Sequence, residues 1–431
     1  MSDPTARHST SEQFRTAATG GQSRVSARWS VLFGLAWTGV WMAQLAPFQY
    51  LLPVQLTAAL GEPVSADGTG WQASVVDFGV VSGLAAVCMA IGLPLAGALS
   101  DRTSGRFGRR RPWIAIGTLV FACALVGLGF QTSTTGIAVW WCAAMFGFCA
   151  VASALTALIK DRVPHEQRGT VAGAMSMAQA FGLIVGLGSV AVLALTADSA
   201  YILLAAFLCA CAAPFFLSAG TEPAAVSRST TAAHLSLSPL ALLRLHDFRW
   251  ALIGRITVNF GNSLCTCLLI YFLQYDLKIA DPGSALLLLT VAYIASVLAV
   301  SMVCGWLSDR VGRRKPFIVG SAALQSVAAV LLMVSDSLWS TVVALAIIGA
   351  GYGCYMGIDQ ALGADVLPDA ENSGKELGVM NVALIVPPAI CPLLGAGLVD
   401  LFDGSFVELF ATSGILTFIG GLAVLRIRSV R

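Results

Sequence analysis

The residues of this chain that are most able to exchange protons or form ion pairs are charged side chains set between long apolar runs. One dense block of charge extends from Asp101 to Arg111 and is followed by Pro112. A shorter block extends from Asp309 to Lys315 and is followed by Pro316. Carboxylates and guanidinium groups form ion pairs, and a carboxylate that is buried can exchange a proton. The chemistry that this pattern favours is therefore ion pairing and the uptake or release of a proton.

The two charged blocks belong to an internal repeat. Pro112 and Pro316 lie 204 positions apart, and so do Asp161 and Asp365, each of which stands three residues before a proline. Two unrelated motifs at one offset indicate two copies of one unit. A duplicated set of membrane helices is typical of secondary transporters.

Composition supports a membrane protein. Hydrophobic residues make up 57% of the chain and charged residues 11%, whereas a soluble domain carries about 25% charged residues. Each apolar run is about 20 residues or longer, which is enough to cross the hydrocarbon of a bilayer. We therefore predict an all-α membrane protein with 12 transmembrane helices in two six-helix bundles related by a pseudo-twofold axis. The expected spans are 29–53, 73–99, 113–132, 136–159, 170–195, 200–218, 250–275, 283–307, 317–335, 338–361, 376–398 and 406–425.

The remaining segments connect or flank the two bundles. We expect a disordered tail at 1–28, a first bundle at 29–218, a linker at 219–249 with a surface helix at 239–246, a second bundle at 250–425 and a tail at 426–431. Of the 25 Lys and Arg residues, 23 fall in the segments that share one side of the membrane with the amino terminus. This bias places both termini in the cytoplasm.

Several functional classes are not expected. The net charge of +2 gives no indication of a nucleic-acid partner. The 11 cysteines fall almost entirely in apolar runs, so we interpret them as small core residues and expect no metal. No Gly-x4-Gly-Lys-Ser/Thr loop occurs, so ATP hydrolysis is not expected. We also expect no enzymatic activity and no cofactor. Energy must come from an ion gradient or from the gradient of the substrate.

The repeated motifs carry a resemblance to a known family. The pattern Gly97-x-x-x-Asp101-Arg102 followed by Gly108-Arg109 resembles the signature loop of the major facilitator superfamily, and the sequence from Asp161 to Gly169 resembles a second signature. The longer spacing of the first block is similar to that of the sucrose/proton symporters and the glycoside–pentoside–hexuronide:cation symporters. This resemblance implies a monomeric symporter in the plasma membrane that carries a sugar or glycoside with protons. The acidic residues of the sodium-coupled branch are replaced by Met89 and Leu93, so a sodium site is not expected.

The resemblance implies a latch on the cytoplasmic side. Asp101 would meet the start of the eleventh helix near residues 374–376, and Asp309 would meet the start of the fifth helix near residues 169–170, where helix dipoles favour an acid. The alternative for the arginines is that they only set the orientation in the membrane. The candidate gating residues are Asp101, Arg102, Gly108, Arg109, Asp161, Glu166, Arg168, Asp309, Arg310, Gly312, Arg313 and Asp365.

Three charged residues are candidates for ion coupling. Arg255 and Asp359 lie inside predicted spans of the second half, where an unpaired charge costs on the order of 3 kcal/mol. Their opposite signs predict a pair, which either couples transport to protons through Asp359 or acts as a static brace between the seventh and tenth helices. Asp77 falls at the outer end of the second helix and serves either as an interfacial cap or in proton entry.

The substrate path is expected between the two halves at mid-depth. Amides that hydrogen-bond and aromatic rings that stack suit a sugar, although Trp and Tyr also lie at lipid interfaces and amides also join helices. The candidate substrate-binding residues are Trp37, Trp41, Gln44, Asn259, Asn262, Thr266, Tyr352 and Tyr355.

Two other functions remain open on the same scaffold. The first is proton-driven efflux of a drug or secondary metabolite, against which the fifth helix lacks the Gly-Pro element of drug/proton antiporters, since no proline occurs between Gly182 and Gly188. The second is a receptor or assembly factor that transports nothing, against which the tails and the linker are short.

Overall fold

The computed structural model describes residues 25–61, 71–103, 109–164, 167–193, 195–218, 244–365 and 374–428. Within these ranges the regular structure is helical. The first half contains α2 (Ala27–Ala46), a π-helical turn (Pro47–Leu51), α3 (Leu52–Ala59), α4 (Trp71–Arg102), α5 (Arg111–Gly129), α6 (Thr134–Arg162), α7 (Arg168–Val192) and α8 (Ala197–Ser218). The second half contains α10 (His246–Cys267), α11 (Leu269–Tyr271), a π-helical turn (Phe272–Asp276), α12 (Pro282–Val311), α13 (Lys315–Met333), α14 (Leu338–Asp365), α15 (Gly374–Leu401), α16 (Val407–Ala423) and a 3-10 turn (Val424–Arg426).

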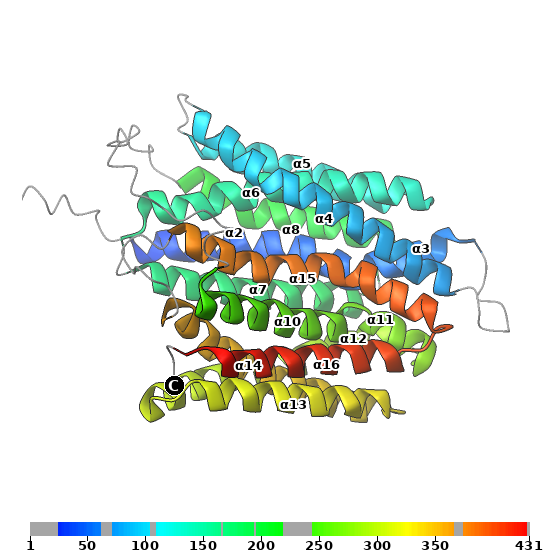
Figure 1. The fold of residues 1–431 in the computed structure, drawn as a ribbon. Coiled ribbons are helices and arrows are strands. Elements are labelled where there is room, and N and C mark those ends of the chain that lie inside the picture. The colour runs from blue at the N-terminus through cyan, green and yellow to red at the C-terminus, as the bar shows by residue number, and fades with distance from the viewer. Residues whose placement is uncertain are drawn as a thin grey trace, which may run out of the picture.

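The length and composition of these helices fit a membrane. Eleven helical segments of the described chain are long and apolar enough to span a bilayer, and α15 adds a shorter apolar stretch at Val386–Leu401. Figure 1 shows these helices running side by side along one common direction. The predicted all-helical membrane fold is confirmed. The first helix begins at Ala27, two residues before the predicted start of the first span at residue 29, and most of the predicted surface helix at 239–246 lies outside the described residues.

Local sequence signals explain where several helices begin and end. The hydroxyl of Ser26 accepts a hydrogen bond from the backbone N–H of Trp29 at the start of α2, and the carboxylate of Asp281 does the same for Ser284 at the start of α12. The repeated prolines Pro112 and Pro316 each stand at the second position of a helix, α5 and α13, where a missing N–H costs nothing. Polar caps and prolines thus mark the helix ends, whose positions the apolar runs alone do not determine.

The two halves repeat the same helix pairing. In the first half α6 packs against α4 and α5, while α2 packs against α7 and α8, and α5 packs against α8. In the second half α14 packs against α12 and α13, while α10 packs against α15 and α16, and α13 packs against α16. Each pair in one half therefore has a counterpart in the other, as the sequence repeat predicts.

The two bundles meet along α4 with α15 and along α7 with α12. We call the end of the bundles that carries Arg102, Arg162 and Arg310 the basic end and the other end the far end. Figure 1 shows α4 and α15 converging at the far end, on the right, and separated at the basic end, on the left. The bundles therefore form a wedge that is closed at the far end.

Aromatic side chains close the far end. The ring of Trp71 at the start of α4 stacks between Tyr275 and Phe406 of the second half, with centroid distances of 4.7 and 5.7 Å. The hydroxyl of Tyr271 donates a hydrogen bond to the backbone carbonyl of Ser74 at 3.1 Å. Both contacts join one bundle to the other. Stacked rings and a buried hydrogen bond together exclude water from this part of the interface.

Candidate transport site

An ion pair is buried in the second bundle. Arg255 on α10 and Asp359 on α14 approach to 2.8 Å between Nε and Oδ2, and their side chains are 2% and 5% exposed. The other carboxylate oxygen of Asp359 accepts a hydrogen bond from the Tyr355 hydroxyl at 2.9 Å. The sequence-based prediction of this pair is therefore confirmed, while its role in coupling stays a prediction.

The ion pair is close but incompletely hydrogen-bonded. The angle of the Nε contact falls outside hydrogen-bond geometry, so Nε and Nη2 of Arg255 and Oδ2 of Asp359 have no hydrogen-bond partner among the described residues. Buried polar atoms in this state carry a free-energy cost and favour any group that satisfies them. The Nη2 atom is thus a donor available to an acceptor from outside the pair.

A ladder of tyrosines and amides extends from the ion pair. The Tyr352 hydroxyl donates to Oδ1 of Asn259 at 2.8 Å, and Nδ2 of the same amide donates to the backbone carbonyl of Arg255 at 2.7 Å. One turn further, the Tyr293 hydroxyl donates to Oδ1 of Asn262 at 3.1 Å. The ladder therefore connects α10 with both α12 and α14.

Helical spacing explains how the ladder is assembled. Arg255, Asn259, Asn262 and Thr266 follow one another at intervals of four, three and four residues, which places them on one face of α10. On α14, Tyr352, Tyr355 and Asp359 follow one another at intervals of three and four residues, which also places them on one face of the helix. Sequence reasoning missed Tyr293, because a lone tyrosine in an apolar helix gives no spacing signal; only its hydroxyl, which needs a partner inside a membrane, could have marked it.

The first bundle contributes aromatic rings rather than hydroxyl groups. Trp37 and Trp41 of α2 stack at 5.8 Å between centroids, and Trp41 also lies 5.8 Å from Phe148 of α6. Trp37 is 2% exposed and belongs to the core of its bundle, whereas Trp41 is partly exposed. The Oε1 atom of Gln44 is buried without a hydrogen-bond partner among the described residues.

The predicted substrate residues thus divide by exposure. Partly exposed side chains can meet a solute directly, and buried ones can only position their neighbours. Thr266 is partly exposed, but its hydroxyl already donates to the backbone carbonyl of Asn262 at 3.1 Å. The partly exposed members are Trp41, Gln44, Asn262, Thr266 and Tyr352, and the buried members are Trp37, Asn259 and Tyr355.

The basic end of the first bundle is held by one buried arginine. Arg110 is 6% exposed in its side chain and contacts Asp101 at 2.6 Å and Asp161 at 3.1 Å. Its Nη1 atom also donates to the Ser100 hydroxyl at 2.8 Å, and Arg109 contacts Asp161 at 2.9 Å. The guanidinium thus joins the ends of α4, α5 and α6. Sequence reasoning selected Arg109 and not Arg110, because nothing in a run of three arginines shows which one turns inward.

The latch stays a prediction. Asp101 pairs with Arg110 of its own bundle, and Gly312 ends α12 in the left-handed conformation with φ of +66°. Arg102 and Arg313 are exposed, and Arg310 lies over the ring of Trp306 at 5.3 Å. Outside the description lie Gly108, Glu166 and the side chains of Arg168, Asp309 and Asp365, together with the side chains at 374–382 that Asp101 is expected to meet.

Asp77 lies inside α4, near the far end of the bundle. Its carboxylate accepts a hydrogen bond from the Thr134 hydroxyl at 2.9 Å, and Thr134 is the first residue of α6. The contact joins α4 to α6 within the first bundle. Asp77 does not cap its own helix, which begins six residues earlier at Trp71. The predicted interfacial cap is therefore corrected to a contact between α4 and the start of α6.

Comparison with known proteins agrees with the architecture. A bacterial homologue of the human lysosomal transporter Spinster, solved in an inward-facing and occupied conformation, is similar over 92% of this chain and 94% of that chain, with a TM-score of 0.64 and 13% identity. The inner membrane transport protein YajR of Escherichia coli (strain K12) is 30% identical over 148 residues, which span 33% of this chain and only 31% of that protein. Residues 30–283 and 251–431 each match the model of the Major Facilitator Superfamily. This chain, with its duplicated bundles and its buried ion pair, therefore belongs to the major facilitator superfamily of membrane transporters.

Proposed function

We propose that this protein is a proton-coupled symporter that carries a sugar or glycoside into the cell by alternating access. The observation that supports this proposal most directly is the buried pair of Arg255 and Asp359, which continues into a ladder of hydroxyl and amide groups. In this proposal the basic end faces the cytoplasm, in keeping with the bias of basic residues. The transporter acts as a monomer in the plasma membrane.

The ion pair supplies a means of coupling. While Arg255 faces Asp359, the two charges neutralise one another in a part of the protein that excludes water. If a bound solute draws the guanidinium away, the carboxylate is left alone in an apolar region and takes up a proton to become neutral. Solute binding and proton binding thus become linked, which is the thermodynamic requirement for symport.

The ladder favours a neutral solute with many hydroxyl groups. The ion pair carries no net charge, so it provides no fixed charge to attract an ionic substrate. Nη2 of Arg255 and Nδ2 of Asn262 make no hydrogen bond among the described residues, and both can donate to a hydroxyl oxygen. In the first bundle, the partly exposed ring of Trp41 can stack on the apolar face of a sugar ring. The resemblance to the sucrose/proton symporters points to the same class.

Transport by reconstituted protein tests both parts of the proposal. Proteoliposomes with an inward proton gradient should accumulate one or more labelled disaccharides or glycosides from a panel. Asp359→Asn should abolish accumulation against a gradient but retain exchange of labelled for unlabelled sugar at equilibrium. Asp400→Asn, which changes an exposed carboxylate on α15, is the matched control and should behave like the unchanged protein.

Two results would contradict the proposal separately. If no sugar in the panel is exchanged or accumulated with or without the proton gradient, the substrate class is wrong. If Asp359→Asn still accumulates sugar to the same ratio as the control variant, Asp359 does not carry the coupling proton, and the pair is a brace between α10 and α14.

Proton-driven efflux of a drug or secondary metabolite is the second candidate. The partly exposed ring of Trp41, which contacts the buried rings of Trp37 and Phe148, favours it, because a flat apolar compound would pack against this ring. A strain that lacks the protein would then be inhibited by a lower concentration of such a compound. Unchanged inhibition across a panel of planar antibiotics, with sugar uptake lost in the same strain, would exclude efflux.

A further inference from the structure

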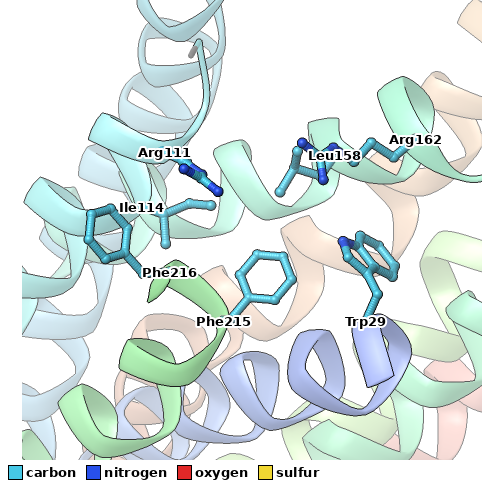
Figure 2. Close-up of a pocket in the computed structure, with 7 residues that line it drawn as sticks. All are labelled: Trp29, Arg111, Ile114, Leu158, Arg162, Phe215 and Phe216. Carbon is cyan, nitrogen blue, oxygen red and sulfur yellow. The ribbon is translucent and has the colours of Figure 1, made fainter. Parts of the chain in front are cut away.

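A crevice opens at the basic end of the first bundle, away from the ion pair and its ladder. Residues from α2, α5, α6 and α8 line it, and Figure 2 shows them around one common space. The lining residues are Trp29, Arg111, Ile114, Leu158, Arg162, Phe215 and Phe216. None of them is acidic, and the set combines two guanidinium groups with an apolar wall.

Three nitrogen-bearing side chains converge on this space. In Figure 2 the guanidinium groups of Arg111 and Arg162 and the indole nitrogen of Trp29 point toward the region above the ring of Phe215. Nε1 of Trp29 is buried without a hydrogen-bond partner, and Arg162 makes no hydrogen bond or ion pair with any residue in the described part of the chain. Trp29 and Arg162 therefore offer donors that no described residue engages.

The electrostatic surroundings favour an anion. The amino-terminal ends of α2, at Ala27, and of α5, at Arg111, both lie at the basic end, and each contributes the positive end of a helix dipole. The carboxylate nearest in sequence, Asp161, is already engaged by Arg109 and Arg110. An incoming anion thus meets positive charge that this carboxylate does not cancel.

The walls of the crevice indicate which anion fits. Ile114, Leu158 and the two phenylalanines present hydrocarbon directly beside the arginines, and Leu217 at the end of α8 is 78% exposed. A free inorganic anion gains nothing from such walls, whereas a phospholipid places its phosphate on the arginines and its acyl chains along the apolar side chains.

We propose that this crevice binds the headgroup phosphate of an anionic phospholipid from the leaflet at the basic end. The guanidinium groups of Arg162 and Arg111 and the indole N–H of Trp29 donate to phosphate oxygens, while Phe216 and Leu217 lie along the acyl chains. The bound lipid would join α2, α5, α6 and α8 at their ends and so stabilise the first bundle.

Lipid retention by the purified full-length protein tests the proposal. Native mass spectrometry after titration with phosphatidylglycerol should show one tightly held lipid, and phosphatidylcholine should be held more weakly. Trp29→Phe, which removes the indole N–H together with its five-membered ring but keeps an aromatic side chain, and Arg162→Gln should each weaken retention about tenfold, because each removes one hydrogen bond to a charged group. Arg249→Gln, which changes an exposed arginine at the start of α10, is the matched control and should have no effect.

Thermal unfolding provides the second measurement. Phosphatidylglycerol should raise the unfolding temperature of the unchanged protein and of Arg249→Gln more than that of Trp29→Phe. Inorganic phosphate at the same concentration should raise none of them. The proposal is overturned if both crevice variants retain the lipid as the control does, or if inorganic phosphate alone protects as well as the lipid. Should Arg162→Gln fail to fold, Trp29→Phe still decides, since it removes the indole N–H but keeps an aromatic side chain and every charge.

Discussion

In the pair of Arg255 and Asp359, each charge lowers the free-energy cost of burying the other. Either charge alone inside a span costs on the order of 3 kcal/mol, yet together they lie within 2.8 Å and are almost fully buried. A buried ion pair adds little to the stability of a fold, because replacing both members by apolar residues often leaves the free energy of unfolding unchanged. Removing only one member, in contrast, strongly lowers that free energy. The distinction leads to a direct prediction.

We predict strong non-additivity between these two residues. Arg255→Met and Asp359→Leu should each lower the free energy of unfolding by about 3–5 kcal/mol, because each leaves a buried charge uncompensated. The double variant should recover most of that loss. Chemical unfolding in detergent measures the three values. Asp359→Leu combined with Asp400→Asn is the control for additivity, and additive losses in the Arg255 cycle would contradict the prediction.

The hydroxyl groups of the ladder differ in what they support. Tyr352→Phe leaves Oδ1 of the buried Asn259 without its donor, and we expect a loss of about 1–3 kcal/mol in unfolding free energy. Tyr293→Phe is the matched change at Asn262, which is partly exposed and can turn to water instead, so the loss should be smaller. Equal thermal unfolding of the two variants would show that burial of the amide does not set the cost.

Only part of the candidate site could be predicted from the residue types in the sequence. Charged residues within apolar runs are so costly that Arg255 and Asp359 could be selected and paired from the sequence alone. Arg110 could not, because only the fold shows that it is the buried arginine that contacts both Asp101 and Asp161, whereas Arg109 contacts Asp161 from a more exposed position. Partners far apart in sequence are decided by packing, not by local pattern.

At the scale of single elements, polar residues at helix ends are open to test. Asp281 precedes α12, and its carboxylate accepts from the hydroxyl and the backbone N–H of Ser284. These hydrogen bonds lower the pKa of Asp281 below its usual range. A lowered pKa in the folded state means that the stabilisation is present at neutral pH and is lost as the pH falls through the folded pKa.

We therefore predict that Asp281→Ala lowers the free energy of unfolding by about 1 kcal/mol at neutral pH, the usual contribution of a helix cap. The difference should shrink as the pH falls below the unfolded pKa of about 3.9 and through the lower folded pKa, since the carboxyl is then protonated in both states. Asp281→Asn keeps the cap without the charge and is the control. Unfolding curves from pH 3 to pH 7 measure the effect, and a loss that does not change with pH would contradict it.

Elements could be located from the sequence more reliably than their internal geometry. Apolar runs of about 20 residues give the spans, because the thickness of the hydrocarbon requires that length. The π-helical turns at Pro47–Leu51 and Phe272–Asp276 were not predicted. Both occur in the first span of their half, near the far end, and the apolar pattern there does not distinguish a widened turn from a regular one.

At the scale of the whole molecule, the repeat predicts two bundles but not which end is closed. The open and closed arrangements of a transporter differ by only a few kcal/mol, and one sequence must encode both. The structure has the far end closed by Trp71, Tyr275 and Phe406. Beneath this aromatic cluster, Gly79 of α4 faces α15 so closely that a Cβ would lie 2.6 Å from Cβ of Ala396.

The close packing of Gly79 against α15 leaves no room for a side chain at this position. Gly79→Val should prevent closure of the far end, because a Cβ there would also lie 3.2 Å from the carbonyl of Pro392. Ser74 is fully buried in the closed arrangement, so Ser74→Cys reports on opening. A membrane-impermeant maleimide should label this cysteine faster when Gly79→Val is present, and transport should be lost. Gly320→Val, where a Cβ meets nothing within 4 Å, is the control. Equal labelling rates in both backgrounds would show that the bundles do not separate at this contact.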